Sequence, residues 1–286
     1  MRKIIVDKNN KKIVNFIKSK FNKVPESAIF KALRQKDIRV NDVRISENVS
    51  VEIGDEITIY IKDEILFGNN ISLKEDWIIY NDENIVIINK PKGILVQGTE
   101  NDIGLDTLIC DYFNSNQIRP CHRLDRNTSG LIIFAKDAES EEIILNLIKN
   151  HEISKYYKCL VHGHPTPKSA TLKAYLFKDS KNNRVIISDE KKKGYVEIIT
   201  KYTVINTYKD NTSLLDIELI TGRTHQIRAH LAFIGHPIIG DGKYGINQVN
   251  KSFNKTWQEL ESYKLCFKNA YGKLEYLKEM IFQIRH

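Results

Sequence analysis

The first sixty residues carry two stretches in which apolar side chains recur with the period of a helix. In "KKIVNFIKSKF", residues 11–21, apolar positions three and four apart fall on one face. "PESAIFKALRQKD", residues 25–37, repeats the pattern, and Pro25 near its start suits the first turn of a helix. The two stretches predict two short helices, each with one buried face.

The period then changes to two, which is typical of strands. "IRVNDVRI", residues 38–45, predicts two short strands joined by a tight turn at Asn41–Asp42. "VSVEIGDEITIYI", residues 49–61, alternates on both sides of Gly54–Asp55. The inward positions are expected at Val49, Val51, Ile53, Ile57, Ile59 and Ile61. Residues 1–62 are therefore expected to form a compact unit that can fold alone.

The chain has no clear period over residues 63–76, which are predicted to be a linker, and a larger domain is expected over residues 77–286. In that domain, strands are predicted within 84–96 on both sides of a Lys-Pro-Lys-Gly turn, over 131–135 and 154–163, and within 195–220; helices are predicted over 138–150 and from Thr221 or Thr224 to Gly235. Strands and helices do not alternate regularly, which argues against a doubly wound fold.

The net charge of +8 is unevenly distributed along the 286 residues. Residues 1–62 contain 14 Lys or Arg and 8 Asp or Glu, so this fifth of the chain carries +6 of the total. A concentrated basic charge favours a polyanionic partner, although a lysine-rich solvated surface is the alternative interpretation. The candidate phosphate contacts are on the second helix and the strands after it: Lys31, Arg34, Lys36, Arg39 and Arg44.

Several common signals are missing from the sequence. No apolar run is long enough to span a bilayer, and the N-terminus lacks the apolar segment of a secretory signal, so we expect a cytoplasmic protein without a membrane partner. The four cysteines form no C-x-x-C pair and the histidines no H-E-x-x-H motif, so no metal site is expected. No glycine-rich nucleotide motif is present.

The clearest candidate for chemistry is "HRLDRNTSG", residues 122–130, in which Asp125 stands between two arginines and an apolar run follows. Taken alone, such a carboxylate is most often part of a structural salt bridge. His122, His225 and His230 offer Asp125 partners for a hydrolase triad, but the chain has no G-x-S-x-G nucleophile elbow. These histidines are more simply explained as hydrogen-bonding supports.

The N-terminal unit resembles the S4 RNA-binding domain. "SAIFKALRQKDIRVNDVRISENVSVEIGDEI" is similar to the helix, the V-x-V-N hairpin and the closing G-D-x-I of that family. Two glycines that are usual in the family, before the first strand and after the Asn, are replaced by Lys36-Asp37 and Asp42.

The rest of the chain, over most of residues 77–270, resembles the RluA-type pseudouridine synthases. "HRLDRNTSG" with its apolar strand matches the family signature, and "DENIVIINKPKGILV" is similar to the first motif. "KYYKCLVHG" and "LLDIELITGRTHQIRAHLAFIGHPIIGDGKYG" are similar to two further motifs, in the family's order. The resemblance implies an α+β catalytic domain with a mixed, largely antiparallel sheet flanked by helices.

The resemblance also implies roles for individual residues. Asp125 would be the catalytic carboxylate, acting as a nucleophile at C1′ or as a base at the ribose, and the residues leave both routes open. Arg223 would be its cationic partner. The ring of Tyr157 would pack against the flipped uracil. Arg123 would enter the space that the base leaves; a phosphate contact or a surface salt bridge is the alternative. Independently of the resemblance, His225 is a further candidate for contact with RNA phosphate.

The substrate implied by this domain combination is large-subunit ribosomal RNA. Two alternatives stay open: a uridine in tRNA, and an RNA-binding ribosome-assembly factor that has lost its activity. Isomerisation of uridine adds and removes nothing, so no cofactor is expected, and the sequence indicates no obligate protein partner.

Overall fold

The computed structural model describes residues 2–7, 11–61, 63–66, 72–99 and 102–284. The chain forms two compact units, Met1–Ser72 with Thr99–Asp102, and Leu73–Gly98 with Ile103–His286. Within the predicted linker, 67–71 lie outside the described residues, and the helix α3 covers Asp63–Leu66. The boundaries at residues 62 and 76 stay predictions.

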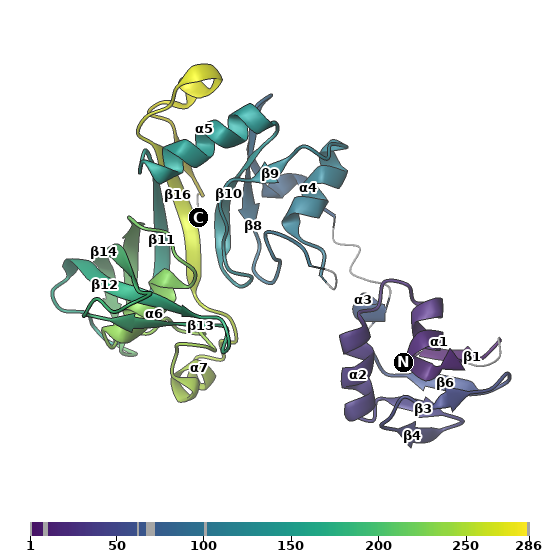
Figure 1. The fold of residues 1–286 in the computed structure, drawn as a ribbon. Coiled ribbons are helices and arrows are strands. Elements are labelled where there is room, and N and C mark those ends of the chain that lie inside the picture. Colours follow the sequence, from purple (N-terminus) through teal and green to yellow (C-terminus); the bar gives the residue numbers. More distant parts are fainter. Residues whose placement is uncertain (1, 8–10, 62, 67–71, 100–101, 285–286) are drawn as a thin grey trace. The chain divides into compact units, whose positions relative to one another are not determined.

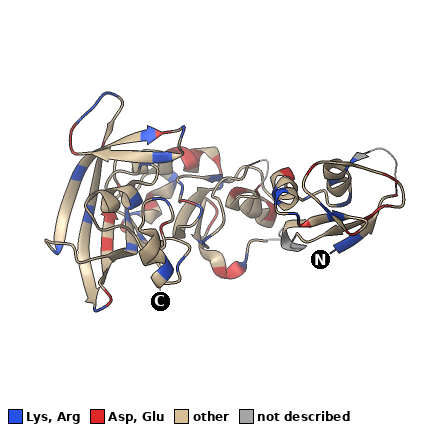
Figure 2. Cartoon of the chain, turned by 90° about the horizontal axis from the view of Figure 1, so that it is seen from below, with Lys and Arg blue, Asp and Glu red and all other residues tan. Residues whose placement is uncertain are grey.

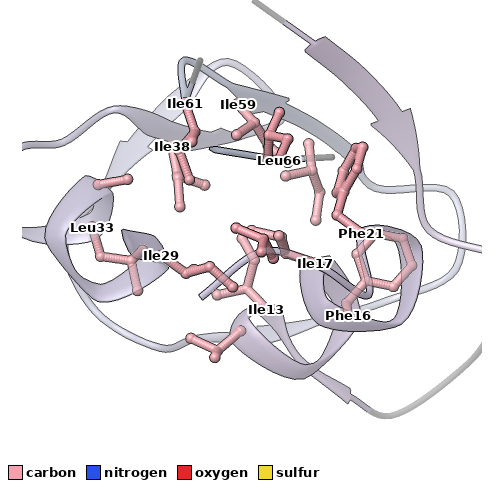
Figure 3. Close-up of a cluster of buried hydrophobic side chains, with 14 of the residues drawn as sticks. Ile13, Phe16, Ile17, Phe21, Ile29, Leu33, Ile38, Ile59, Ile61 and Leu66 are labelled. Atoms are coloured by element: carbon pink, nitrogen blue, oxygen red, sulfur yellow. The ribbon is translucent and has the colours of Figure 1, made fainter. Parts of the chain in front are cut away.

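The first unit contains the two predicted helices, α1 (Ile13–Lys20) and α2 (Glu26–Arg34). Their apolar faces are buried against the strands in one core, shown in Figure 3. The largest of its fully buried side chains are Ile13, Phe16, Ile17, Ile29, Leu33, Ile38, Ile57, Ile59 and Leu66. The helical period in the sequence therefore located both helices and their inner faces.

The strands of this unit form a four-stranded sheet and a separate pair. The sheet has the order β1 (Arg2–Ile5), β6 (Glu56–Ile59), β3 (Ile38–Val40) and β4 (Val43–Ile45), and β2 (Lys11–Lys12) pairs with β5 (Ser50–Val51). The tight turn at Asn41–Asp42 is confirmed, with φ of 49° and 64°. The inward position predicted for Ile53 is wrong: β5 ends at Val51 and the Ile53 side chain is 58% exposed.

The second unit is built on a mixed sheet of eleven strands. Its main path has the order β13 (Arg184–Ser188), β12 (Ser169–Asp179), β14 (Val196–Tyr208), β15 (Thr212–Leu219), β11 (Ile153–His162), β16 (Leu260–Phe267), β10 (Ser129–Ala135), β8 (Ile85–Lys90) and β7 (Ile78–Asn81), while β9 (Arg119–Pro120) pairs with β10 and β17 (Ile281–Gln283) with β16. Among the described strands only β10 and β16 pair in parallel, so the predicted mixed, largely antiparallel sheet is confirmed.

Helices flank this sheet, as Figure 1 shows. They are α4 (Leu105–Phe113), α5 (Ala138–Lys149), α6 (Gln226–Phe233) and α7 (Asn247–Ser252), with the 3₁₀ turns η1 (Glu75–Trp77) and η2 (Gly272–Leu277). The helix α5 buries Ile143, Ile144 and Leu147 in a core with β8, β10 and β11. Ala229 of α6 is buried against β12, β13 and β14. No described helix has the length and apolar character that a membrane crossing requires.

Two boundaries differ from the sequence prediction. The helix expected from Thr221 or Thr224 begins at Gln226, because His225 has φ of 53° and interrupts the helical backbone. The strand expected after the Lys-Pro-Lys-Gly turn is reduced to a single bridge between Leu95 and Gly104. Here the Ile94 carbonyl accepts from the Lys90 ammonium, which holds the segment as a loop.

Candidate active site

Asp125 lies in a tight turn that leads into β10. The Thr128 N–H donates to the Asp125 carbonyl at 3.0 Å, and the Gln258 side chain donates to Thr128 Oγ1 at 3.2 Å. Gly130 follows with φ of 112°, and a Cβ built there would lie 2.2 Å from the Ser262 carbonyl oxygen of β16. Only glycine fits this close parallel pairing, which fixes where the turn presents Asp125.

Lys90 ties two loops together beneath this turn. Its side chain is fully buried, and its ammonium donates to the carbonyls of Pro91, Ile94 and Arg126 at 2.9, 2.9 and 3.0 Å. Burial lowers the pKa of Lys90 to about 7, although the negative charge of Asp125 acts to raise it. The three bonds hold the residue after Asp125 in place.

The guanidinium that contacts Asp125 belongs to Arg228 of α6. Arg228 Nη1 donates to Asp125 Oδ2 at 2.7 Å, and the Arg228 side chain is only 8% exposed. The expectation that Arg223 is this partner is wrong. Arg223 lines the same cavity, but it precedes α6. The described arginine that forms an ion pair with Asp125 is Arg228. Arg228 is reached instead because it lies in the first turn of the helix.

Asp241 holds Arg228 from the opposite side. Arg228 Nε and Nη2 donate to the two Asp241 carboxylate oxygens at 2.7 and 2.9 Å. Asp241 is fully buried, and its Oδ1 also accepts from the backbone N–H groups of Lys243 and Tyr244. Burial alone would raise the pKa of Asp241, but the hydrogen bond and charge of Arg228 outweigh it and hold that pKa below its usual value. Neither residue of this bidentate pair was among the site residues expected from the sequence.

His225 approaches the other oxygen of Asp125. Its Nε2 lies 3.9 Å from Asp125 Oδ1, and its Nδ1 lies 2.9 Å from the Tyr244 hydroxyl. The Tyr244 hydroxyl also accepts from the Val185 N–H at 2.8 Å, so β13 holds the group that contacts the imidazole. Burial lowers the pKa of His225, while Asp125 opposes the shift.

These groups line a cavity of about 240 Å³. Tyr157 of β11 belongs to its wall and is 4% exposed, whereas Tyr156 is directed to Glu218. Burial raises the pKa of Tyr157, so its phenol stays protonated near neutral pH. Arg123 lies at the same cavity with an exposed side chain. Lys155, which our sequence analysis did not single out, also lines the cavity, and burial lowers its pKa.

His122 and His230, the other two histidines considered as partners of Asp125, make hydrogen bonds within the fold. His122 Nε2 accepts from the Ile133 N–H at 3.1 Å, and burial lowers the pKa of His122 to about 3. His230 Nδ1 lies 3.0 Å from Thr200 Oγ1, and burial lowers its pKa to about 4. The described residues contain no cluster of three or more His, Cys, Asp or Glu side chains that could hold a metal ion.

The candidate phosphate contacts of the first unit lie on α2 and the β3–β4 hairpin. Lys31, Arg34, Lys36 and Arg44 are exposed, and Arg39 is half-buried with its guanidinium 5.2 Å from the Tyr60 ring centroid. Arg39 and Arg44 are direct cross-strand partners. The Arg39 Nε is buried and has no hydrogen-bond partner among the described residues.

Comparison with known proteins addresses the second unit most directly. The family model described as RNA pseudouridylate synthase matches residues 84–233. A Mycoplasma capricolum protein named "Uncharacterized RNA pseudouridine synthase" is 31% identical, with 98% of this chain and 96% of that protein covered. A Buchnera aphidicola protein named "Ribosomal large subunit pseudouridine synthase C" is 35% identical, with 84% and 79% covered.

The fold has a counterpart among solved structures. The structure of "Human RNA Pseudouridylate Synthase Domain Containing 4" superposes with a TM-score of 0.58 at 22% identity, covering 73% of this chain and 88% of the human one. This likeness concerns the fold alone.

Proposed function

The chain belongs to the RNA pseudouridine synthase family, and we propose that it isomerises uridines in large-subunit ribosomal RNA with Asp125 as the catalytic carboxylate. The observation that carries the proposal is the ion pair of Asp125 with a guanidinium that a second, fully buried carboxylate holds in place. The substrate class follows the name of the Buchnera relative.

In the reaction, the N1–C1′ bond of uridine breaks, the uracil turns, and C5 bonds to C1′; C5 loses a proton and N1 gains one. Among the described residues, the ion-pair contact of Asp125 Oδ1 is the 3.9 Å approach of His225, and Asp125 lines the cavity. We therefore assign this oxygen the role of nucleophile at C1′ or of base at the ribose. Arg228 keeps the other oxygen fixed and favours the ionised form that both routes require.

Tyr157 and Arg123 are proposed to handle the base. The buried, protonated Tyr157 would pack its ring against the uracil, because an uncharged aromatic wall suits a flipped base. The exposed Arg123 guanidinium lies at the cavity and would stack where the base has left the RNA.

The first unit is proposed to be an S4-like RNA-binding domain. Two arginines directly opposite each other in a hairpin repel, so Arg39 and Arg44 destabilise the free protein. A phosphate between them would relieve that repulsion. Lys31, Arg34, Lys36 and the His225 of the second unit are the further proposed RNA contacts.

The test of the catalytic proposal compares wild type with Asp125→Asn on unmodified transcripts of bacterial large-subunit ribosomal RNA and of tRNA. Wild type should form pseudouridine in the ribosomal transcript, and Asp125→Asn should form none while its RNA affinity stays within a few-fold. Asp111→Asn, an exposed aspartate on α4, is the matched control. Product in tRNA only would refute the substrate, and full activity of Asp125→Asn would refute the residue.

The test of the first unit is the salt dependence of RNA binding. Replacing Arg39 and Arg44 by Gln should weaken binding and reduce the slope of log Kd against log salt by about 0.7 to 0.9, which corresponds to the one phosphate proposed between them. An unchanged slope would argue against an RNA-binding role for this hairpin.

A further inference from the structure

A second cavity, of about 1010 Å³, is lined by the C-terminal part of α6, whereas Asp125 contacts Arg228 in the first turn of that helix. Its walls are β13, the exposed end of α6 and the loop Gly242–Gly245. We propose that this cavity, here named the β13 groove, binds unpaired nucleotides of the substrate RNA next to the modified uridine. The proposal rests on the proposed function, because it names a further part of the same RNA-binding surface.

The charge around the β13 groove fits RNA. Residues 168–201, which form β12, β13 and the start of β14, contain nine Lys or Arg and four Asp or Glu, a balance of +5. Residues 63–286 together carry only +2, so the rest of that segment is net negative. All nine basic side chains are exposed, and Lys and Arg are blue in Figure 2. The positive charge of the second unit is therefore concentrated at this hairpin.

The two cationic side chains that line the β13 groove, Arg184 and Lys243, are proposed to contact phosphate. Arg184 and Lys243 form no ion pair with a described carboxylate; Arg184 lies over the Tyr244 ring at 5.7 Å, and the Lys243 amine donates to the Asn183 carbonyl. The groove also contains Asp179, but that carboxylate accepts from the Asn182 backbone and side chain at 3.1 and 2.7 Å within the hairpin turn. Asp179 is also the cross-strand partner of Arg184, whose charge helps to lower the pKa of Asp179, so this carboxylate offsets part of one groove cation.

The groove also offers apolar surface for a base. Phe233, on the last turn of α6, is 48% exposed, and Ile186 of β13 is 43% exposed. Nucleic-acid bases stack on exposed rings when they are unpaired, whereas the bases of a duplex are already stacked on each other. A ring beside two cations therefore favours single-stranded RNA.

The β13 groove is close to the catalytic carboxylate. Tyr244 lines the groove, its hydroxyl lies 2.9 Å from His225 Nδ1, and His225 Nε2 lies 3.9 Å from Asp125. Two side chains thus separate the groove from the catalytic carboxylate. Nucleotides next to the uridine at Asp125 can reach the groove, and this proximity distinguishes it from a distant basic patch.

The test measures binding in full-length protein that carries Asp125→Asn, so that no turnover intervenes. The probes are a labelled 12-nucleotide oligouridylate and a 12-base-pair RNA duplex. Arg184→Gln with Lys243→Gln should raise the Kd for the single strand about 10-fold and reduce its salt slope by about 1.4, which corresponds to two lost phosphate contacts. Phe233→Ala should raise the same Kd about 10-fold without changing the slope, because stacking carries no charge.

The matched controls are Lys149→Gln and Leu145→Ala, which remove an exposed cation and an exposed apolar side chain from α5. The inference is overturned if the groove variants bind within two-fold of the parent, if the controls lose as much, or if the duplex is weakened equally. Pseudouridine formation is measured separately in the wild-type protein, in which Asp125 is unchanged. Its absence would refute the proposed function, while unchanged binding would refute the groove.

Discussion

Replacing Arg228 by lysine and replacing Arg223 by lysine are predicted to have very different effects. Lysine keeps the positive charge but cannot contact two carboxylates with a planar fork. Arg228 makes three charge-assisted hydrogen bonds, one to Asp125 and two to Asp241. Arg223 is exposed, and its backbone N–H donates to Gln226. The structure therefore predicts a large effect for Arg228→Lys and a small one for Arg223→Lys.

The magnitude follows from the bonds lost. A single ammonium cannot replace both Asp241 contacts and the Asp125 contact, so at least one charge-assisted bond is lost, at about 1.5–3 kcal/mol of unfolding free energy. Removing one partner of a buried pair completely costs about 3–5 kcal/mol, so Arg228→Leu should lie in that higher range. A displaced Asp125 should also slow the chemical step by about 100-fold or more, as removal of a preorganised charge does.

The assay combines urea unfolding with single-turnover pseudouridine formation at saturating enzyme. Under those conditions the folded fraction is known and RNA affinity does not limit the rate. Arg228→Lys should lose both stability and rate, whereas Arg223→Lys should keep the stability of wild type and at least a tenth of its rate. If Arg223→Lys abolishes the reaction while Arg228→Lys retains it, our assignment of the ion-pair partner is refuted.

Three further predictions concern the surroundings of the turn. Lys90→Met should lower the unfolding free energy by about 3 kcal/mol or more, because three carbonyls lose their donor; an unchanged urea midpoint would contradict this. Gly130→Ala should greatly reduce the yield of folded protein, since its Cβ would overlap the Ser262 backbone, and a wild-type melting temperature would exclude that clash. The pKa of His230 is lowered to about 4, so its contribution to stability is complete above about pH 6.5 and is lost as the pH falls toward 4, where the unfolded chain binds the proton first. His230→Gln should flatten the melting temperature across that window, and an identical pH profile would argue against it.

The local elements followed from the sequence because their causes are local. The apolar spacing of α1 and α2 located both helices, and Asn41–Asp42 located the β3–β4 turn through side chains that tolerate positive φ. The hairpin β12–β13 was not predicted, although Leu172, Ala174 and Leu176 of β12 alternate with more exposed neighbours. This is a local period-two pattern of the kind that indicates a strand, and our prediction missed it.

The sequence by itself determined the helices α1, α2 and α5 and the turn at Asn41–Asp42, and it singled out Asp125 and Tyr157, because the motifs that contain them are contiguous. Only the tertiary structure decided that Arg228 and Asp241 complete the site. Asp125 and Arg228 are 103 positions apart, and the helix α6 has to begin at Gln226 for that arginine to reach the carboxylate. Which of two nearby arginines meets a distant carboxylate depends on the direction of each side chain from its helix turn, and periodicity carries no information about that direction between separate elements.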